Sequence, residues 1–186
     1  MDTKSQLINT ATALFQQKGY KSVGLNEILK ACNVTKGALY HHFPNGKEEL
    51  LIACLHDLNE AITTDIKTIF KENLSIREAI RSMIDKLVHD FESDGTLSGY
   101  TFSSMVSEMA TVSEPVRNAC SALYENIQHI FYEKLVTEGF SSESASEMAL
   151  LMTASIEGAM MLCRTQKSTD PLKTVAKLIP NLLKSF

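Results

Sequence analysis

The sequence predicts an all-α protein of about nine helices. Apolar residues recur every three or four positions along most of the chain, which is the period of an amphipathic helix. Alternation of apolar and polar residues, which would indicate β-strands, is nearly absent. Helix caps, glycines and prolines divide the chain at intervals typical of helices. A length of 186 residues with 44% hydrophobic content can bury a substantial core in one large domain or two small ones.

Three short helices are predicted within the first 46 residues. The first spans Thr3–Lys18 and ends at Gly19, because glycine is common just after a helix C-terminus. The second spans Leu25–Cys32, and the third covers residues 35–42. Only Asn33-Val34 separates the last two, and a turn of this length between short helices predicts a helix-turn-helix unit.

Longer helices are predicted for the rest of the chain. Pro44-Asn45-Gly46 breaks the third helix, and a long helix then starts near Lys47. Ser75 and Glu78 match the Ser-x-x-Glu capping box, and Pro180 must kink or interrupt the last helix. The predicted helices cover about residues 47–71, 75–93, 100–111, 113–139, 142–166 and 170 onwards.

The long helix that starts near Lys47 joins two parts of opposite charge. The first 50 residues carry six lysines and four acidic residues, a net charge of +2. The remaining residues carry 12 basic and 18 acidic side chains, a net charge of −6. A basic head on an acidic body is expected where the head faces nucleic acid. We therefore divide the chain into residues 1–46 and 47–186, coupled through this shared helix.

Residues 34–43 carry the most specific chemistry in the sequence. Their predicted helix offers threonine, lysine, tyrosine and histidine beside a glycine, a set suited to lie against a phosphate backbone. Thr35 can cap this helix, and Leu39 can face the core. Gly37 costs a helix about 1 kcal/mol relative to alanine, and close approach to DNA is the natural compensation. DNA binding is therefore the leading interpretation.

The first fifty residues resemble the TetR family of bacterial transcriptional repressors. The resemblance rests on Ala-Leu-Phe at 13–15, Lys-Gly-Tyr at 18–20, Glu-Ile at 27–28, the run at 31–43 and Lys-Glu-Glu-Leu at 47–50. The Pro-Asn-Gly before Lys47 is similar to the branch that contains lincomycin-resistance-type repressors. The resemblance implies an all-α homodimer with a three-helix DNA-binding head and a C-terminal ligand-binding and dimerisation body. It also implies repression of genes, often for efflux pumps, that is relieved when a small molecule binds the body.

The residues expected to contact a double-stranded DNA operator lie on the third helix and at the start of the long one. Lys36 can meet phosphate or the O6/N7 edge of guanine, and Ala38 can meet a thymine methyl. Tyr40 and the two histidines after it fit phosphate contacts, although ordinary exposed positions also carry such side chains. Lys47 matches a phosphate-contacting lysine of the family. The full set is Thr35, Lys36, Gly37, Ala38, Tyr40, His41, His42 and Lys47.

Leu25 departs from the family pattern. Many relatives carry a threonine near this position that touches phosphate, and leucine cannot make that contact. The contact is therefore lost or is supplied by Ser22 or Asn26.

The body is expected to hold a pocket for a small hydrophobic effector. Six of the eight methionines fall between residues 105 and 161, and methionine adapts to irregular cavities, although it also fills an ordinary core. Small residues between 145 and 159 would let helices approach closely in a two-fold homodimer, which a palindromic operator requires. The pocket candidates are Met83, Leu87, Phe91, Phe102, Met105, Met109, Tyr124, Phe131 and Met152.

Other function classes find little support in the sequence. It contains no catalytic triad order, phosphate-binding glycine loop or His-Glu-x-x-His motif, so we expect no enzyme, no metal site and no cofactor. No apolar run approaches the roughly 18 residues of a membrane span, and the N-terminus lacks a signal-peptide pattern. We therefore expect a cytoplasmic protein without a membrane partner, whose four cysteines are buried thiols. A helical carrier without DNA binding and an activator are the alternatives.

Overall fold

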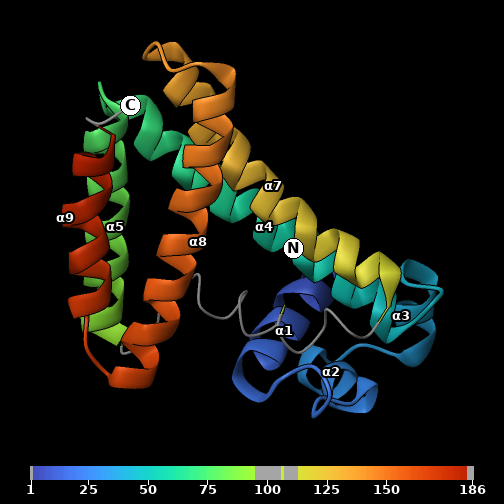
Figure 1. Cartoon of the computed structure of the whole chain (residues 1–186). Coiled ribbons are helices and arrows are strands. Elements are labelled where there is room, and N and C mark those ends of the chain that lie inside the picture. The colour runs from blue at the N-terminus through green and yellow to red at the C-terminus, as the bar shows by residue number, and fades with distance from the viewer. Residues whose placement is uncertain (1, 95–105, 107–112, 184–186) are drawn as a thin grey trace. The chain divides into compact units, whose positions relative to one another are not determined.

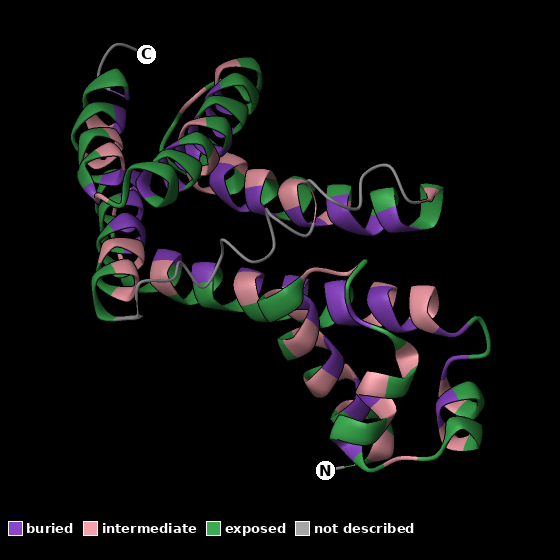
Figure 2. Cartoon of the chain, turned by 90° about the horizontal axis from the view of Figure 1, so that it is seen from below, coloured by how far each residue is buried: buried purple, intermediate pink, exposed green. Residues whose placement is uncertain are grey.

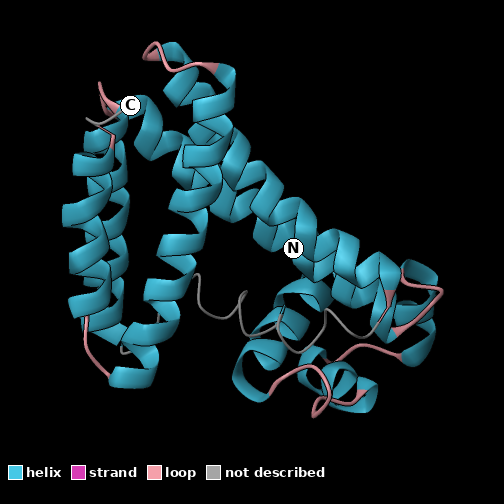
Figure 3. Cartoon of the chain, in the orientation of Figure 1, coloured by secondary structure: helices cyan, strands magenta, loops and turns pink. Residues whose placement is uncertain are grey.

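The computed structural model describes residues 2–94, 106 and 113–183 of the chain. These residues form eight helices and no strand, which confirms the all-α fold (Figure 3). The helix expected over 100–111 lies outside the described residues apart from position 106. The helices are α1 (Thr3–Lys18), α2 (Leu25–Cys32), α3 (Lys36–His42), α4 (Lys47–Glu72), α5 (Ile76–Asp94), α7 (Glu114–Thr137), α8 (Ser142–Gln166) and α9 (Asp170–Leu182).

Capping residues set the limits of the helices. The carboxylate of Asp2 accepts a hydrogen bond from the backbone N–H of Ser5 at 2.7 Å, and Gly19 ends α1 with a φ of 79°. The predicted capping box before α5 is confirmed. The backbone N–H of Ser75 donates to the Glu78 carboxylate at 3.1 Å, and the N–H of Glu78 donates to the Ser75 hydroxyl at 3.2 Å.

Pro180 does not interrupt α9, so of the two expected outcomes, a kink or an interruption, the interruption was wrong. The helix continues past the proline to Leu182. Pro180 lies in the last turn, where a missing N–H removes a single backbone hydrogen bond near the helix end. The neighbouring Ile179 and Leu183 are buried, and their burial holds this turn against the core.

The chain divides into two compact units, and α4 and α7 contribute residues to both. Unit 1 comprises Met1–Ala61 and Thr101–Ala122, and unit 2 comprises Ile62–Tyr100 and Leu123–Phe186. Buried residues recur along the helices, between exposed and intermediate ones (Figure 2). Each unit is described in turn.

In unit 1, α1 packs against α2 and α3. Fully buried apolar residues from all three helices meet in this core, and the first turns of α4 add Leu50, Leu51 and Leu55. The turn between α2 and α3 passes through Asn33, whose φ of 53° is left-handed and is tolerated by asparagine. The core residues of the three short helices include Leu7, Ala11, Phe15, Ile28, Cys32 and Leu39.

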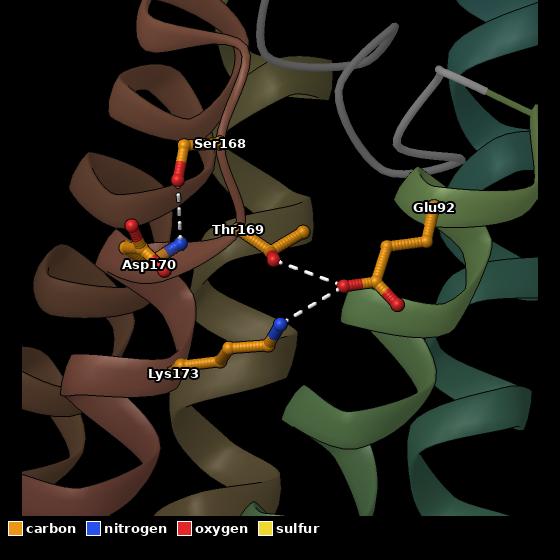
Figure 4. Close-up of polar contacts among 5 residues, drawn as sticks. All are labelled: Glu92, Ser168, Thr169, Asp170 and Lys173. Atoms are coloured by element: carbon orange, nitrogen blue, oxygen red, sulfur yellow. Dashed lines mark hydrogen bonds and ion pairs between the residues drawn. The ribbon is translucent and has the colours of Figure 1, made fainter.

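In unit 2, α9 packs against both α5 and α8, and α5 and α9 lie side by side (Figure 1). A polar contact joins their ends. The Glu92 carboxylate accepts hydrogen bonds from the Thr169 hydroxyl at 3.0 Å and from the Lys173 ammonium at 2.9 Å (Figure 4). The backbone N–H of Asp170, the first residue of α9, donates to the Ser168 hydroxyl at 3.1 Å. These bonds fix the turn between α8 and α9 against α5.

The last turns of α7 hold the turn between α4 and α5. The Lys134 ammonium donates to the backbone carbonyls of Asn73 at 3.0 Å and Leu74 at 3.2 Å. One turn later, the Glu138 carboxylate accepts a hydrogen bond from the backbone N–H of Ile76. A cation thus meets the C-terminus of one helix and an anion meets the N-terminus of the next, as the helix dipoles favour.

Among the described helices, α8 is long and apolar enough, by length and composition, to cross a membrane. This differs from the expectation that no segment approaches that limit. One such helix is weak evidence by itself, and the most apolar window of α8 is 44% buried inside the structure. The pattern is therefore weak support for a membrane span.

Candidate nucleic-acid interface

Helix α3 is anchored on one side and exposed on the others. Thr35 caps it, and its hydroxyl accepts a hydrogen bond from the backbone N–H of Ala38 at 3.2 Å. Leu39 is fully buried and fixes the helix on the core. Lys36 and His41 lie on the exposed surface. The short helix therefore presents donors and a cation to solvent from a rigid base.

Gly37 faces open space. A Cβ atom at this position would meet only the Thr35 hydroxyl oxygen, at an ordinary contact distance of 3.9 Å. The fold of the free chain therefore does not require glycine here. The absence of a side chain leaves the backbone of α3 open to solvent at this position.

Tyr40 lies over the turn that leads into α4. A Cβ atom at Gly46 would meet Cε1 of Tyr40 at 3.5 Å, its Oη at 3.7 Å and Cδ1 of Leu25 at 3.8 Å. Gly46 itself is buried with a φ of +71°, a conformation that favours glycine. Tyr40 remains 40% exposed, and the Lys36 ammonium lies 5.8 Å from the centroid of its ring. The hydroxyl of Tyr40 is thus held close to the start of α4.

The first turn of α4 is tied to its surroundings by side chains. The backbone N–H of Asn45 donates to the Glu49 carboxylate at 2.8 Å. The Ser113 hydroxyl donates to the Glu48 carboxylate at 2.8 Å and also accepts from the backbone N–H of Val116 at 3.4 Å. The N-terminus of α7 is therefore linked to the N-terminus of α4 within unit 1.

The ammonium of Lys47 has partners inside the chain. It donates to the backbone carbonyl of Tyr20 at 2.5 Å and lies 3.9 Å from the centroid of the Tyr20 ring. The ring of Phe15 lies 5.9 Å from the same ammonium and packs edge-on against Tyr20 at 5.3 Å. Burial first, and the charge of Glu48 second, raise the pKa of the Tyr20 hydroxyl, so the ring stays neutral at physiological pH.

The two histidines at the end of α3 differ in exposure. His41 is exposed, while His42 is half-buried, and their rings meet edge-on at 5.0 Å. The ring of His42 also lies 6.4 Å from that of the buried Phe43. His41 is therefore the more accessible donor at this end of the helix.

The predicted DNA-contacting residues of α3 share one short element, with Thr35, Lys36, Gly37, Tyr40 and His41 all exposed. Both positions considered in place of Leu25, Ser22 and Asn26, are exposed as well. Sequence reasoning did not single out Tyr20, whose partner Lys47 lies 27 residues away. Tyr20 appeared there only as part of the Lys-Gly-Tyr motif at 18–20, with no contact assigned to it.

The residues predicted to line the pocket differ in how far they are buried. Met83, Phe131 and Met152 are buried in unit 2, while Leu87, Phe91 and Tyr124 are half-buried. The Tyr124 hydroxyl donates to the Glu157 carboxylate at 3.4 Å, a polar pair that the sequence did not suggest. Phe102, Met105 and Met109 lie outside the described residues. Among the residues that the structure describes, no group of three or more histidine, cysteine or acidic side chains could hold a metal ion.

Comparison with known proteins agrees with this architecture over the full chain. The family model described as bacterial regulatory proteins, tetR family, matches residues 7–54. The model described as transcriptional regulator LmrA/YxaF-like, C-terminal domain, matches residues 77–178.

Individual relatives match at nearly full length. The chain is 36% identical to the HTH-type transcriptional regulator YxaF of Bacillus subtilis, covering 98% of this chain and 96% of the relative. It is 34% identical to the HTH-type transcriptional regulator LmrA of the same organism, covering 98% and 97%. The crystal structure of reduced Escherichia coli NemR superposes with a TM-score of 0.88 at 25% identity, covering 97% and 96%. These relatives are regulators of transcription and not enzymes. The helix-turn-helix head, the helical body and these matches together show that the chain belongs to the TetR family of bacterial DNA-binding transcriptional regulators, with a C-terminal domain of the LmrA/YxaF-like type.

Proposed function

We propose that the chain is a repressor that binds a palindromic operator as a homodimer and leaves it when a small hydrophobic molecule binds. The observation that carries this proposal is the anchored helix α3, which is capped by Thr35, fixed by Leu39 and open at Gly37. In this proposal residues 1–46 form the DNA-binding part. Residues 47–186 form the ligand-binding and dimerisation part, and the protein acts in the cytoplasm.

The exposed face of α3 would enter the major groove. Its front residues approach base edges and phosphates, with Lys36 as the candidate partner of guanine O6 and N7. Tyr40 and the histidines donate to phosphates, and Lys47 adds positive charge at the start of α4. The proposed contact set is Thr35, Lys36, Gly37, Ala38, Tyr40, His41, His42 and Lys47.

The proposed dimer would form through α8 and α9. Both helices expose large apolar side chains, with Met161 at 61% and Leu150 at 57% exposure. Of the small residues expected at this interface, Ala154 and Gly158 lie on the exposed part of α8, whereas Ala145, Ala149 and Ala159 face the core of their own unit. Exposed apolar faces of this kind mark protein interfaces. The exposed residues are Leu150, Leu151, Met161, Leu162, Leu178 and Leu182.

The proposed effector is a small hydrophobic molecule bound by the body, and the proposed targets are efflux or resistance genes, as the family resemblance implies. Met83, Phe131 and Met152 supply buried apolar surface, and the Tyr124–Glu157 pair would orient a polar group. Helix α4 contributes residues to both units, so a change in its position caused by ligand binding in the body can be transmitted to the DNA-binding part. Coupling of about 1–3 kcal/mol is typical of such transitions.

The proposal is tested by fluorescence anisotropy on DNA from upstream of the protein's own gene, with scrambled DNA as control, across a salt series. We expect nanomolar, sequence-dependent binding with a steep salt slope. Lys36→Met should weaken binding and reduce the slope by about one unit, whereas Lys67→Met, at an exposed lysine outside α3, should leave both unchanged. If the operator is not upstream of the protein's own gene, a selection of bound sequences from a pool of random DNA duplexes will identify it. Failure of that selection to enrich any sequence would overturn the proposal.

A further inference from the structure

The contact between Lys47 and Tyr20 joins two segments that carry the helix-turn-helix unit. Tyr20 follows the end of α1 and lies in the link to α2, while Lys47 is the first residue of α4. The ammonium meets both the backbone carbonyl of Tyr20, at 2.5 Å, and the face of its ring, at 3.9 Å from the centroid. The contact therefore joins two positions that are 27 apart in the sequence and that enclose α2 and α3.

Two different attractions hold the ammonium at this place. A carbonyl oxygen accepts a charge-assisted hydrogen bond, which is stronger than one between neutral groups. The ring face attracts a cation within about 6 Å of its centroid, and the Phe15 ring at 5.9 Å extends the same aromatic surface. The side chain of Lys47 is half-buried, so water screens these attractions less than at an open surface.

The position of this contact connects it to the DNA-binding helix. Gly46, directly before Lys47, is the residue over which the Tyr40 ring lies. A displacement of Lys47 from Tyr20 would therefore move the turn that supports Tyr40. The contacts of Lys47 with Phe15 and Tyr20 therefore adjoin the turn over which Tyr40 lies.

We propose that Tyr20 is a positioning residue for DNA recognition, whose ring and carbonyl hold the Lys47 ammonium and thereby set the start of α4 beneath Tyr40. This inference rests on the proposed function, because it assigns a role within operator binding. The proposal gives Lys47 a role that differs from that of a residue that only binds phosphate. A lysine that only binds phosphate would contribute to operator affinity independently of Tyr20. The contact described here makes the contributions of Lys47 and Tyr20 to operator affinity depend on each other.

The test is a double-mutant cycle of Tyr20→Leu and Lys47→Met, read by operator anisotropy across a salt series. Each single variant should weaken binding by about 5-fold or more, and the double variant should bind about as well as Lys47→Met alone. Tyr20→Phe keeps the ring and the backbone carbonyl and should bind like the wild type. Lys30→Met, an exposed lysine of α2, is the matched control, and its effect should add to that of Tyr20→Leu. Additive effects of Tyr20→Leu and Lys47→Met would overturn the proposal.

A second measurement detects the contact directly in the folded protein without DNA, so it does not depend on operator binding or on a loss of folding in the variants. Because the ammonium lies over the Tyr20 ring, the ε-methylene protons of Lys47 should show upfield ring-current shifts in the NMR spectrum of the free protein. The shift should persist in Tyr20→Phe and disappear in Tyr20→Leu. Its absence from the wild type would overturn the proposed contact. If the shift is present but no duplex is bound with sequence preference, the proposed function has failed while the contact itself stands.

Discussion

The hydroxyl of Ser113 donates a hydrogen bond to the carboxylate of Glu48 over 2.8 Å, and so ties the first turn of α4 to the start of α7. Ser113 also caps α7 through the backbone N–H of Val116. One hydroxyl thus serves two helix starts. Loss of this hydroxyl should therefore destabilise the starts of both α4 and α7.

Ser113→Ala should lower the free energy of unfolding by about 1–2 kcal/mol, because it removes a helix cap and leaves a half-buried carboxylate without this donor. Denaturant unfolding monitored by circular dichroism measures the change. Ser146→Ala, at an exposed position inside α8, is the control and should change stability by less than about 0.5 kcal/mol. Equal effects of the two substitutions would contradict a capping role for Ser113.

Gly37→Ala should stabilise the free protein and weaken operator binding. The open surroundings of Gly37 accept a methyl group, so the gain should approach the helix propensity difference of about 1 kcal/mol. Thermal unfolding and operator anisotropy on the same preparation check both signs. A bulky residue, as in Gly37→Trp, should abolish operator binding while the dimer persists in size-exclusion chromatography. Normal operator binding by Gly37→Trp would show that α3 does not approach DNA through this position.

Gly46→Ala should have the opposite effect on stability. At a φ of +71° an alanine is strained by about 1 kcal/mol or more, whereas its Cβ would meet Tyr40 and Leu25 only at ordinary contact distances of 3.5–3.8 Å. We expect a lower melting temperature together with weaker operator binding. A variant as stable as the wild type would mean that the turn before α4 adapts freely.

The pair of Glu92 and Lys173 should give unit 2 a defined pH dependence. Hydrogen bonds from Lys173 first and Thr169 second lower the pKa of Glu92 from its ordinary 4.5. The hydrogen bond with Glu92 raises the pKa of Lys173 from its ordinary 10.5. The contribution of Glu92 to stability is therefore present above its ordinary pKa and lost as the pH falls through the lowered value. That of Lys173 is present below 10.5 and lost as the pH rises through the raised value.

Glu92→Gln should therefore destabilise the protein by a constant amount near neutral pH, and the difference from the wild type should vanish in acid. Urea unfolding at a series of pH values follows this difference. Glu143→Gln, at an exposed glutamate of α8, is the control. A difference for Glu92→Gln that persists unchanged to the lowest pH would contradict the assigned bonds.

The cysteine thiols should resist modification in the folded protein. All four are buried, and burial raises the pKa of Cys54 to about 12 and that of Cys120 to about 11. At pH 7 only about one in 10⁴ thiols with a pKa of 11 is ionised, and the thiolate is the reactive form. Reaction with Ellman's reagent should be at least about 100-fold slower than in guanidinium chloride. Rapid labelling of the native protein would instead point to an accessible, activated cysteine.

Much of the fold follows from local sequence signals. The C-terminal ends of α1 and α2 agree with the approximate bounds predicted from the sequence, because Gly19 and Asn33 follow them with positive φ values of 79° and 53°, which favour glycine and asparagine. The residues exposed on α3 could also be predicted, because the Thr35 cap sets where the helix begins and the buried Leu39 sets which of its faces packs on the core. Local periodicity and capping carry this information directly.

Contacts between distant segments could not be predicted in the same way. Nothing in the spacing of Tyr20 and Lys47 indicates that they meet, because the folding of α2 and α3 brings them together. The small residues of α8 show the same limit. Ala145 and Ala154 read alike in sequence, yet one is buried in its own unit and the other is exposed. Which face of a helix is covered depends on tertiary packing rather than on residue type.

The contrast between Gly37, inside α3, and Gly46, directly before α4, has an evolutionary consequence. The exposed positions at Lys36, Gly37 and His41 make few demands on the fold, whereas Leu39 and Gly46 are held by their neighbours. If α3 reads the operator as proposed, a copy of this chain that arises by gene duplication could change its operator through a few substitutions at these exposed positions, without first acquiring stabilising changes elsewhere. The architecture of the head thus permits regulators to diverge rapidly in target while they retain a common frame.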